Sequence, residues 1–302
     1  MTGSAGPVPV TRPAFLAESP VWDASSQSLL WVDIMAGDVH RLDPSTGEDS
    51  VTRVSVPVGA VAPRQAGGLI LAAALGFATL DERTGVLDWI WTGGRGDRMN
   101  DGKCDPAGRF LAGTLTYARD PGACALYRLD PGGGPGGGPG GHLAARVSTL
   151  LDGVTLSNGL GWNPAGDLLY FADTELERVD VLRYDPATGA VSDRRVFADL
   201  HDVPGRPDGL TVDSEGAVWI AMSRGGAVRR YTAGGRLDHV IGFPVRLVTS
   251  VTFGGAELGD LYVTTSREGL GESDLAGQPL AGSVFLVGET SFRGLPANTF
   301  AG

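Results

Sequence analysis

Five side chains that carry oxygen atoms recur at one register of a repeated sequence pattern. The register positions lie five residues before a turn and hold Glu18, Gly59, Asn100, Asn158, Asp208 and Thr249. Glu18, Asn158 and Asp208 offer two carboxylates and one amide oxygen, which are ligands that Ca²⁺, Mg²⁺ and Mn²⁺ prefer. The sequence therefore predicts a site for one hard divalent cation.

The competing interpretation is that these residues only stabilise turns. Asn-Gly and Asp-Gly are common turn dipeptides, so Asn158-Gly159 or Asp208-Gly209 alone would favour a turn. Their coincidence with Glu18 at one register reverses that preference, because carboxylates and amides buried together without a partner are costly. None of the four histidines falls at this register, which argues against a histidine-rich zinc site.

The elements that position these residues are short strands. Residues 207–221 are typical of strand, turn and strand, with apolar runs at 210–212 and 218–220 on either side of a turn that ends at Gly216. Six copies occur, with turn positions separated by 41, 41, 58, 50 and 41 residues. Most copies are followed by a further alternating strand and a Thr-Gly or Asp-Pro turn, as at 181–189. Four short strands per repeat predict an all-β fold, a six-bladed β-propeller with four-stranded antiparallel blades.

The 58-residue interval contains a low-complexity insertion. Residues 132–141 are rich in glycine and proline and predict a flexible loop inserted in blade three. A linker between two domains is the alternative, but the repeat continues unchanged on both sides. We therefore expect residues 1–302 to form a single β-propeller domain.

Composition excludes several classes of function. The net charge of −11 and the pI near 4.8 disfavour binding to nucleic acid or to an anionic membrane. The first 16 residues lack a secretory leader pattern, so a cytoplasmic protein is expected. The expected oligomeric state is a monomer or weak homodimer. Cys104 and Cys124 have no CxxC spacing, which favours two reduced cysteines over a disulfide.

Arg98 is a candidate for binding a substrate together with Asn100. The two residues are two positions apart, so a strand would turn both side chains to the same face. An arginine at the mouth of a channel donates a forked pair of hydrogen bonds to a polyhydroxylated or carboxylated ligand. The alternative is a surface arginine, since Arg98 lies in a glycine-rich polar run that also contains Arg95.

Five short strings resemble those of the SMP-30/gluconolactonase/regucalcin family. They are ESPVW at 18–22, RMNDGK at 98–103 with DPAGRF at 105–110, SNGL at 157–160, PDGL at 207–210 with DSEG at 213–216, and FGG at 253–255. The resemblance implies a six-bladed propeller that holds one divalent ion, Ca²⁺, Mg²⁺, Mn²⁺, Zn²⁺ or Fe²⁺, and hydrolyses sugar lactones such as gluconolactone. It assigns the metal to Glu18, Asn158 and Asp208 and the substrate to Arg98 and Asn100. Some members carry acidic residues where this chain has GTLTYA at 113–118, which alters a wall of the sugar pocket.

The expected reaction is metal-assisted hydrolysis of an aldonolactone to the open acid. Asp208 is the candidate for orienting or deprotonating the attacking water, and Arg98 and Asn100 are expected to hold the sugar hydroxyls. Two other functions stay open. The same channel could hydrolyse another ester or an organophosphate, or the protein could be a non-catalytic calcium-binding regulator.

Overall fold

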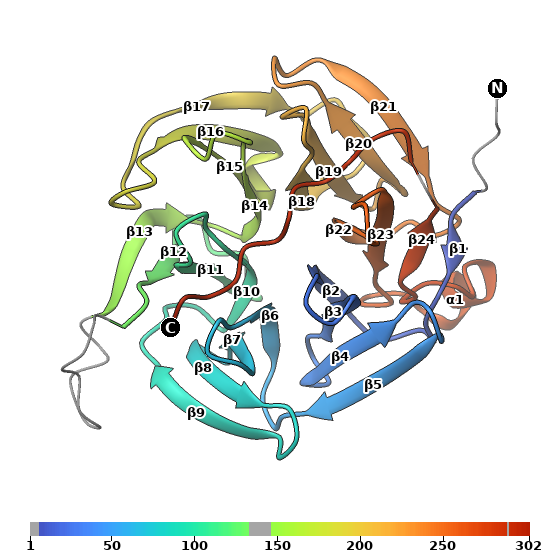
Figure 1. Ribbon diagram of the computed structural model, residues 1–302. Coiled ribbons are helices and arrows are strands. Elements are labelled where there is room, and N and C mark those ends of the chain that lie inside the picture. The colour runs from blue at the N-terminus through green and yellow to red at the C-terminus, as the bar shows by residue number, and fades with distance from the viewer. Residues whose placement is uncertain (1–5, 133–145, 289) are drawn as a thin grey trace.

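The chain folds into six antiparallel sheets arranged in a ring (Figure 1). The computed structural model describes residues 6–132, 146–288 and 290–302. Each sheet has four strands, which confirms the prediction of an all-β, six-bladed β-propeller. The loop predicted at 132–141 falls between two strands of the third blade, and all of it except Gly132 lies outside the described residues.

The first strand of each blade lies at the centre of the ring, and each contacts its neighbours around the ring. These inner strands are β2 (Ala17–Asp23), β6 (Val58–Pro63), β10 (Arg98–Cys104), β14 (Ser157–Trp162), β18 (Arg206–Val212) and β22 (Val248–Gly254). Because they all run in the same direction along the axis, equivalent positions of the six repeats come to the same depth of the channel.

The remaining strands lie progressively farther from the axis. The second strands are β3 (Ser28–Asp33), β7 (Leu69–Ala73), β11 (Phe110–Leu115), β15 (Leu168–Asp173), β19 (Val218–Ser223) and β23 (Asp260–Thr265). The third are β4 (Asp38–Asp43), β8 (Gly76–Asp81), β12 (Cys124–Leu129), β16 (Arg178–Tyr184), β20 (Ala227–Tyr231) and β24 (Phe285–Val287). The outermost are β5 (Glu48–Arg53), β9 (Val86–Trp91), β13 (Val147–Val154), β17 (Val191–Asp199), β21 (Leu237–Gly242) and β1 (Val8–Pro9).

The sixth blade takes its outer strand from the beginning of the chain. β1 pairs antiparallel with β24, and Val10 N donates to Val284 O at 2.9 Å. The repeat pattern does not predict this strand, because it has only two residues. The pairing joins the two ends of the repeat array and closes the ring.

Large aromatic side chains on the second strands fill the space between blades. Trp31, Tyr170, Trp219 and Tyr262 all lie at the middle of such strands and are at most 2% exposed. Burying a side chain of this size stabilises the fold by roughly 1.5–3 kcal/mol. The repeated aromatic position therefore supports the packing that holds the inner strands in place.

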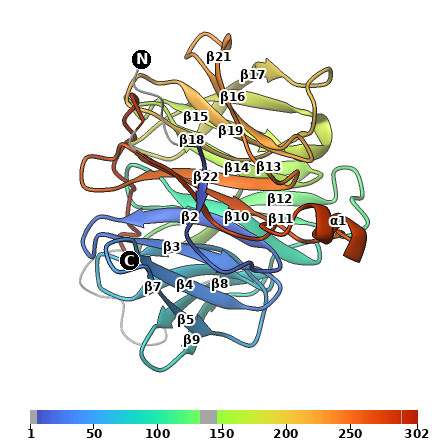
Figure 2. The ribbon, with the colours of Figure 1, turned by 90° about the vertical axis from the view of Figure 1, so that its right-hand side faces the viewer.

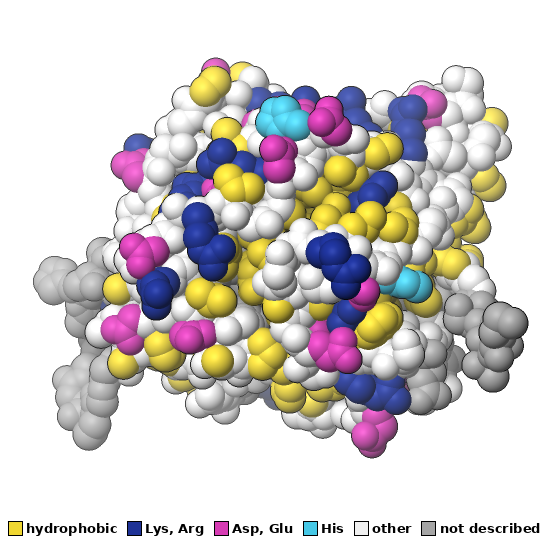
Figure 3. All heavy atoms as spheres, turned by 90° about the horizontal axis from the view of Figure 1, so that it is seen from above, with side chains coloured by type: hydrophobic (Ala, Val, Ile, Leu, Met, Phe, Trp, Pro, Cys, Tyr) yellow, Lys and Arg dark blue, Asp and Glu magenta, His cyan; other side chains and the backbone are white. Residues whose placement is uncertain are grey.

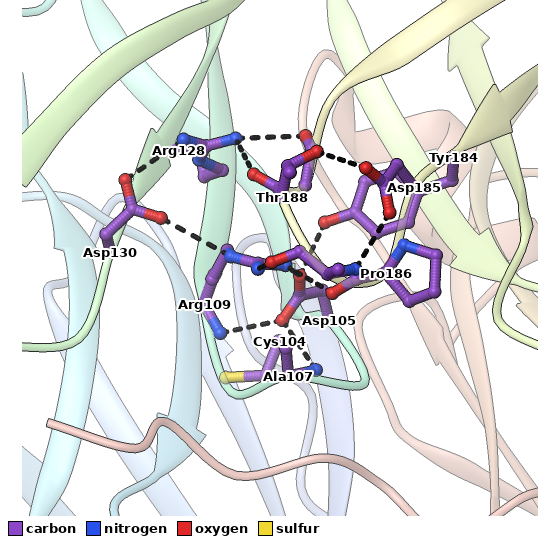
Figure 4. A network of polar contacts seen from close by, with 12 residues as sticks. Cys104, Asp105, Ala107, Arg109, Arg128, Asp130, Tyr184, Asp185, Pro186 and Thr188 are labelled. Carbon is purple, nitrogen blue, oxygen red and sulfur yellow. Dashed lines mark hydrogen bonds and ion pairs between the residues drawn. The ribbon is translucent and has the colours of Figure 1, made fainter.

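Aspartates at the predicted turns also tie strands together. Asp105, directly after β10, accepts hydrogen bonds from the backbone of Ala107 and Arg109 and from the side chain of Arg109, whose guanidinium also donates to the carbonyls of Pro186 and Ala187 in the next blade (Figure 4). Tyr184 adds an O–H donor to the same carboxylate. The network fixes the third blade against the fourth.

The two faces of the ring differ. The short helix α1 (Glu272–Gly277) lies at one face, and the C-terminal end of the chain lies at the other (Figure 2). There the C-terminal segment, residues 290–302, crosses several blades and forms bridges at Asp213↔Gly294 and Arg64↔Phe300. A 3-10 turn, η2 (Thr174–Leu176), follows β15 at the face that carries α1.

The outer edge carries mixed charge. On the edge seen in Figure 3, Lys/Arg and Asp/Glu side chains alternate with hydrophobic ones, and neither sign dominates.

No helix within the described ranges is long and apolar enough to cross a lipid bilayer. Cys104 and Cys124 are both buried and free.

Candidate metal and substrate site

A β-bulge interrupts each inner strand at the predicted register. The pairing of β2 with β3 shifts between Glu18 and Val21, and equivalent shifts occur in the first strand pair of the other five blades. A bulge leaves residues unpaired and re-aims their side chains. The bulges therefore explain why a polar side chain turns into the channel in five of the six repeats although it belongs to a strand; the second repeat has Gly59 at this position.

The predicted site residues line one cavity. Glu18, Arg98, Asn100, Asn158 and Asp208 all border a space of about 340 Å³ at the end of the channel near α1. Each of them is at most 8% exposed. Of the six register positions only Gly59 does not line the cavity, and Thr249 does so while its hydroxyl donates to Ala17 O at 2.6 Å.

Asn158 presents an amide oxygen without a partner. Its Nδ2 donates to Thr174 Oγ1 at 3.0 Å, and the Thr174 hydroxyl in turn donates to Pro207 O at 2.8 Å. Thr174 therefore only accepts from Asn158, which fixes the orientation of the amide. The Oδ1 atom is buried and accepts no hydrogen bond, as expected of an atom that can act as a ligand to a cation.

The two carboxylates are buried close together. Burial raises the pKa of Glu18 well above its ordinary value, and the negative charges of Asp208 and Asp101 add to the shift. Burial likewise raises the pKa of Asp208 to about 7, with Asp101 again adding to the shift. Two carboxylates in this position ionise together only when a positive charge offsets their repulsion, so the donor set fits a divalent cation.

Asn158 is essential to that donor set. Within the described residues there is no group of three or more His, Cys, Asp or Glu side chains arranged to hold a metal ion. The candidate site thus consists of two carboxylates and one amide oxygen, a composition that suits hard divalent cations.

Arg98 and Asn100 form a connected pair beside these residues. Arg98 Nη1 donates to Asn100 Oδ1 at 2.7 Å and to Met99 O at 2.9 Å, and Asn100 Nδ2 donates to Ser157 O at 2.8 Å. The buried Nε of Arg98 has no hydrogen-bond partner. The pair lies inside the channel, so the alternative of a surface arginine is wrong for Arg98.

Several residues of the site could not be found from the repeat. Thr174, which orients Asn158, belongs to η2 and lies outside the inner strands. Arg119 and Arg206 line the cavity mouth and are bridged by Glu175, at 2.7 and 2.6 Å. The residues at 115–117, where the chain departs from the acidic pattern, also line the cavity, which places that departure beside the predicted substrate position.

Comparisons with known proteins agree with this architecture. A family model described as "SMP-30/Gluconolactonase/LRE-like region" matches residues 16–267. Regucalcin of Homo sapiens is 36% identical over 295 residues, covering 94% of each chain. A calcium-binding regucalcin of Agrobacterium tumefaciens superposes with a TM-score of 0.88 at 26% identity, covering 98% of this chain and 97% of that one. A gluconolactonase of Xanthomonas campestris shares the fold, with a TM-score of 0.72 at 20% identity over 93% of this chain and 88% of that one.

The family match spans most of the propeller and includes all five predicted site residues, from Glu18 to Asp208. The resemblance seen in short sequence strings is confirmed over residues 16–267. The chain belongs to the SMP-30/gluconolactonase/LRE-like family.

Proposed function

We propose that this protein is a divalent-metal-dependent lactonase that hydrolyses a sugar lactone, such as gluconolactone, to the open aldonic acid. The observation that carries the proposal is the convergence of Glu18, Asp208 and the unpartnered Asn158 Oδ1 in one buried cavity beside Arg98. The family description, which names gluconolactonase, supports the same reaction.

The chain's own residues would divide the work as follows. Glu18, Asn158 and Asp208 would hold one divalent cation, which would supply Lewis-acid polarisation of the lactone carbonyl. Asp208 would orient the attacking water and accept its proton. Arg98 would donate to sugar oxygens through its guanidinium, and its bond to Asn100 would keep that group in place.

The test is hydrolysis of glucono-1,5-lactone in a pH-stat, by protein stripped with chelator and then supplied with each divalent ion in turn. We expect turnover that depends on the ion and disappears in Asp208→Ala. The control is Asp202→Ala, which removes the same charge at an exposed position upstream in the chain. Full activity in Asp208→Ala, or equal activity in the stripped protein, would refute the proposal.

A calcium-binding regulator without turnover is the second candidate, because the similar curated proteins carry the name regucalcin. It predicts calcium binding by calorimetry with no hydrolysis of any lactone. Hydrolysis of an aryl phosphotriester in preference to lactones would instead indicate ester chemistry of a different substrate class.

A further inference from the structure

A second cavity, of about 320 Å³, lies at the opposite end of the channel. The inner strands run from the first cavity to the second, so residues that come later in each strand line it. Its walls are largely apolar and include Pro20, Val61, Ala62, Trp162 and Val212. Residues 295–298 of the C-terminal segment form another wall, while exposed Pro106 and Pro164 border it on the solvent side.

Lys103 is the one cationic side chain on the wall of this cavity, as far as the described residues go. It is partly buried, and its Nζ donates to Leu210 O at 2.9 Å, reaching from blade three to blade five. No carboxylate of the described residues forms an ion pair with it within 4.0 Å. A buried ammonium without an ion-pair partner is unfavourable, which favours the neutral amine.

Lys103 is also the only lysine of the protein. The chain has 24 lysine and arginine residues, and the other 23 are arginines. A guanidinium stays charged in proteins, whereas a lysine amine loses its proton when it is desolvated. Burial lowers the pKa of Lys103, and the charge of Asp101 opposes the shift only in part. The one lysine of the chain thus lies beside a largely apolar cavity, at a position where burial lowers the pKa of its amine.

We propose that this cavity is a second ligand site, which takes a small aldehyde or ketone and holds it as a reversible imine on Lys103. The amine lone pair forms a bond to the carbonyl carbon, and the carbonyl π electrons move to oxygen, which gains a proton. Loss of that oxygen as water, with the nitrogen giving up its proton, forms the C=N bond. Asp101 lines the same cavity and is available to exchange these protons.

The test uses benzaldehyde with sodium cyanoborohydride at pH 7, which reduces an imine to a stable secondary amine. The α-amino group is the internal reference, because Lys103 is the only other primary amine. An ordinary lysine contains about 340-fold less neutral amine than an α-amino group at this pH, given pKa values of about 10.4 and 7.8. We expect Lys103 to be modified at least as fast as the α-amino group, at a rate that saturates with benzaldehyde, as measured by peptide mass spectrometry.

Lys103→Met is the matched control, since it keeps an unbranched side chain of similar length, adds no charge to the cavity and removes the nucleophile. We expect it to give only the α-amino adduct. Benzyl alcohol, which has the same shape without the carbonyl, should slow labelling of Lys103 but not of the α-amino group. Labelling of Lys103 that lags as an ordinary lysine does, or that rises linearly with benzaldehyde, would overturn the proposal. Protection by benzoate without any adduct would also overturn it, by indicating an anion site.

Discussion

Replacing Asp208 with Asn is expected to make the metal-free protein more stable at pH 8, although it removes a proposed metal ligand. Burial, with the charge of Asp101, raises the pKa of Asp208 from 3.8 to about 7 in the metal-free fold. In the unfolded chain the carboxyl returns to its ordinary pKa, so between about pH 4 and pH 7 the folded state binds more protons. The contribution of the Asp208 carboxyl to the unfolding free energy is therefore fully present below about pH 4 and is lost as the pH rises toward 7.

The magnitude follows from that difference in pKa. A change of about 3 corresponds to about 4 kcal/mol of unfolding free energy, since each unit is worth about 1.4 kcal/mol. Asp208 is only 8% exposed, so water screens little of this effect. Asn keeps the shape of the side chain and carries no charge, so the unfolding free energy of the variant does not fall as Asp208 of the native protein ionises. The substitution also removes part of the repulsion that Glu18 experiences, because the charge of Asp208 is one cause of the raised pKa of Glu18. This effect further stabilises the variant.

The assay is urea unfolding followed by tryptophan fluorescence in chelator, at pH 5 and pH 8, with and without added Ca²⁺. In chelator at pH 8 we expect the unfolding free energy of Asp208→Asn to exceed that of the native protein by up to about 4 kcal/mol. At pH 5 the difference should be about 2 kcal/mol or less. Added Ca²⁺ should stabilise the native protein and not the variant. A variant that is less stable than the native protein in chelator at pH 8 would refute the reasoning, as would a native protein equally stable at both pH values.

Three further outcomes are expected. In Gly159→Ala the new Cβ would lie 2.6 Å from the carbonyl oxygen of Asp208, so the two inner strands must move apart. Calorimetry should then show a Ca²⁺ affinity at least about tenfold weaker than that of the native protein. An unchanged Ca²⁺ affinity would contradict this prediction. Arg230→Met leaves the fully buried Asp213 carboxylate without its ion pair and should lower the unfolding free energy by roughly 3–5 kcal/mol in urea; a loss below about 1 kcal/mol would mean that the pair is not needed. Arg98→Lys keeps the positive charge but removes the planar pair of N–H donors of the guanidinium, so KM for the lactone should rise roughly tenfold while kcat changes little. A fall in kcat alone would argue against a role of Arg98 in substrate binding.

The sequence predicts the ring and its polar centre because both depend on local, repeated features. Each inner strand is followed by a turn whose chemistry is encoded within a few residues, as at Asp213 and Gly216, where φ is +79°. A constant register then brings Glu18, Asn158 and Asp208 to one depth of the channel. That step needs no knowledge of side-chain packing.

Contacts between different blades are what the sequence does not reveal. Ser19, with a left-handed φ of 45°, donates to Gly59 O and to Asp101 Oδ1, and so links three inner strands behind Glu18. Thr174 follows β15 in the same blade as Asn158, orients that amide and donates to Pro207 O of the next blade. The C-terminal segment lies against the second cavity without any periodic pattern. Such contacts join residues far apart in the chain, and no spacing rule predicts them.

The pairing of β1 with β24 also sets an order of events during synthesis. β1 precedes the inner strands of all six repeats in the chain, while its partner at 285–287 follows them, so the ribosome makes the whole repeat array between the two. Until then the nascent chain can form only an open arc, whose first and last blades expose strand edges and apolar faces that invite aggregation. The ring can thus close only after the third strand of the sixth blade has been made, and a ribosome that stalls within the sixth repeat would release a product that cannot form this pairing.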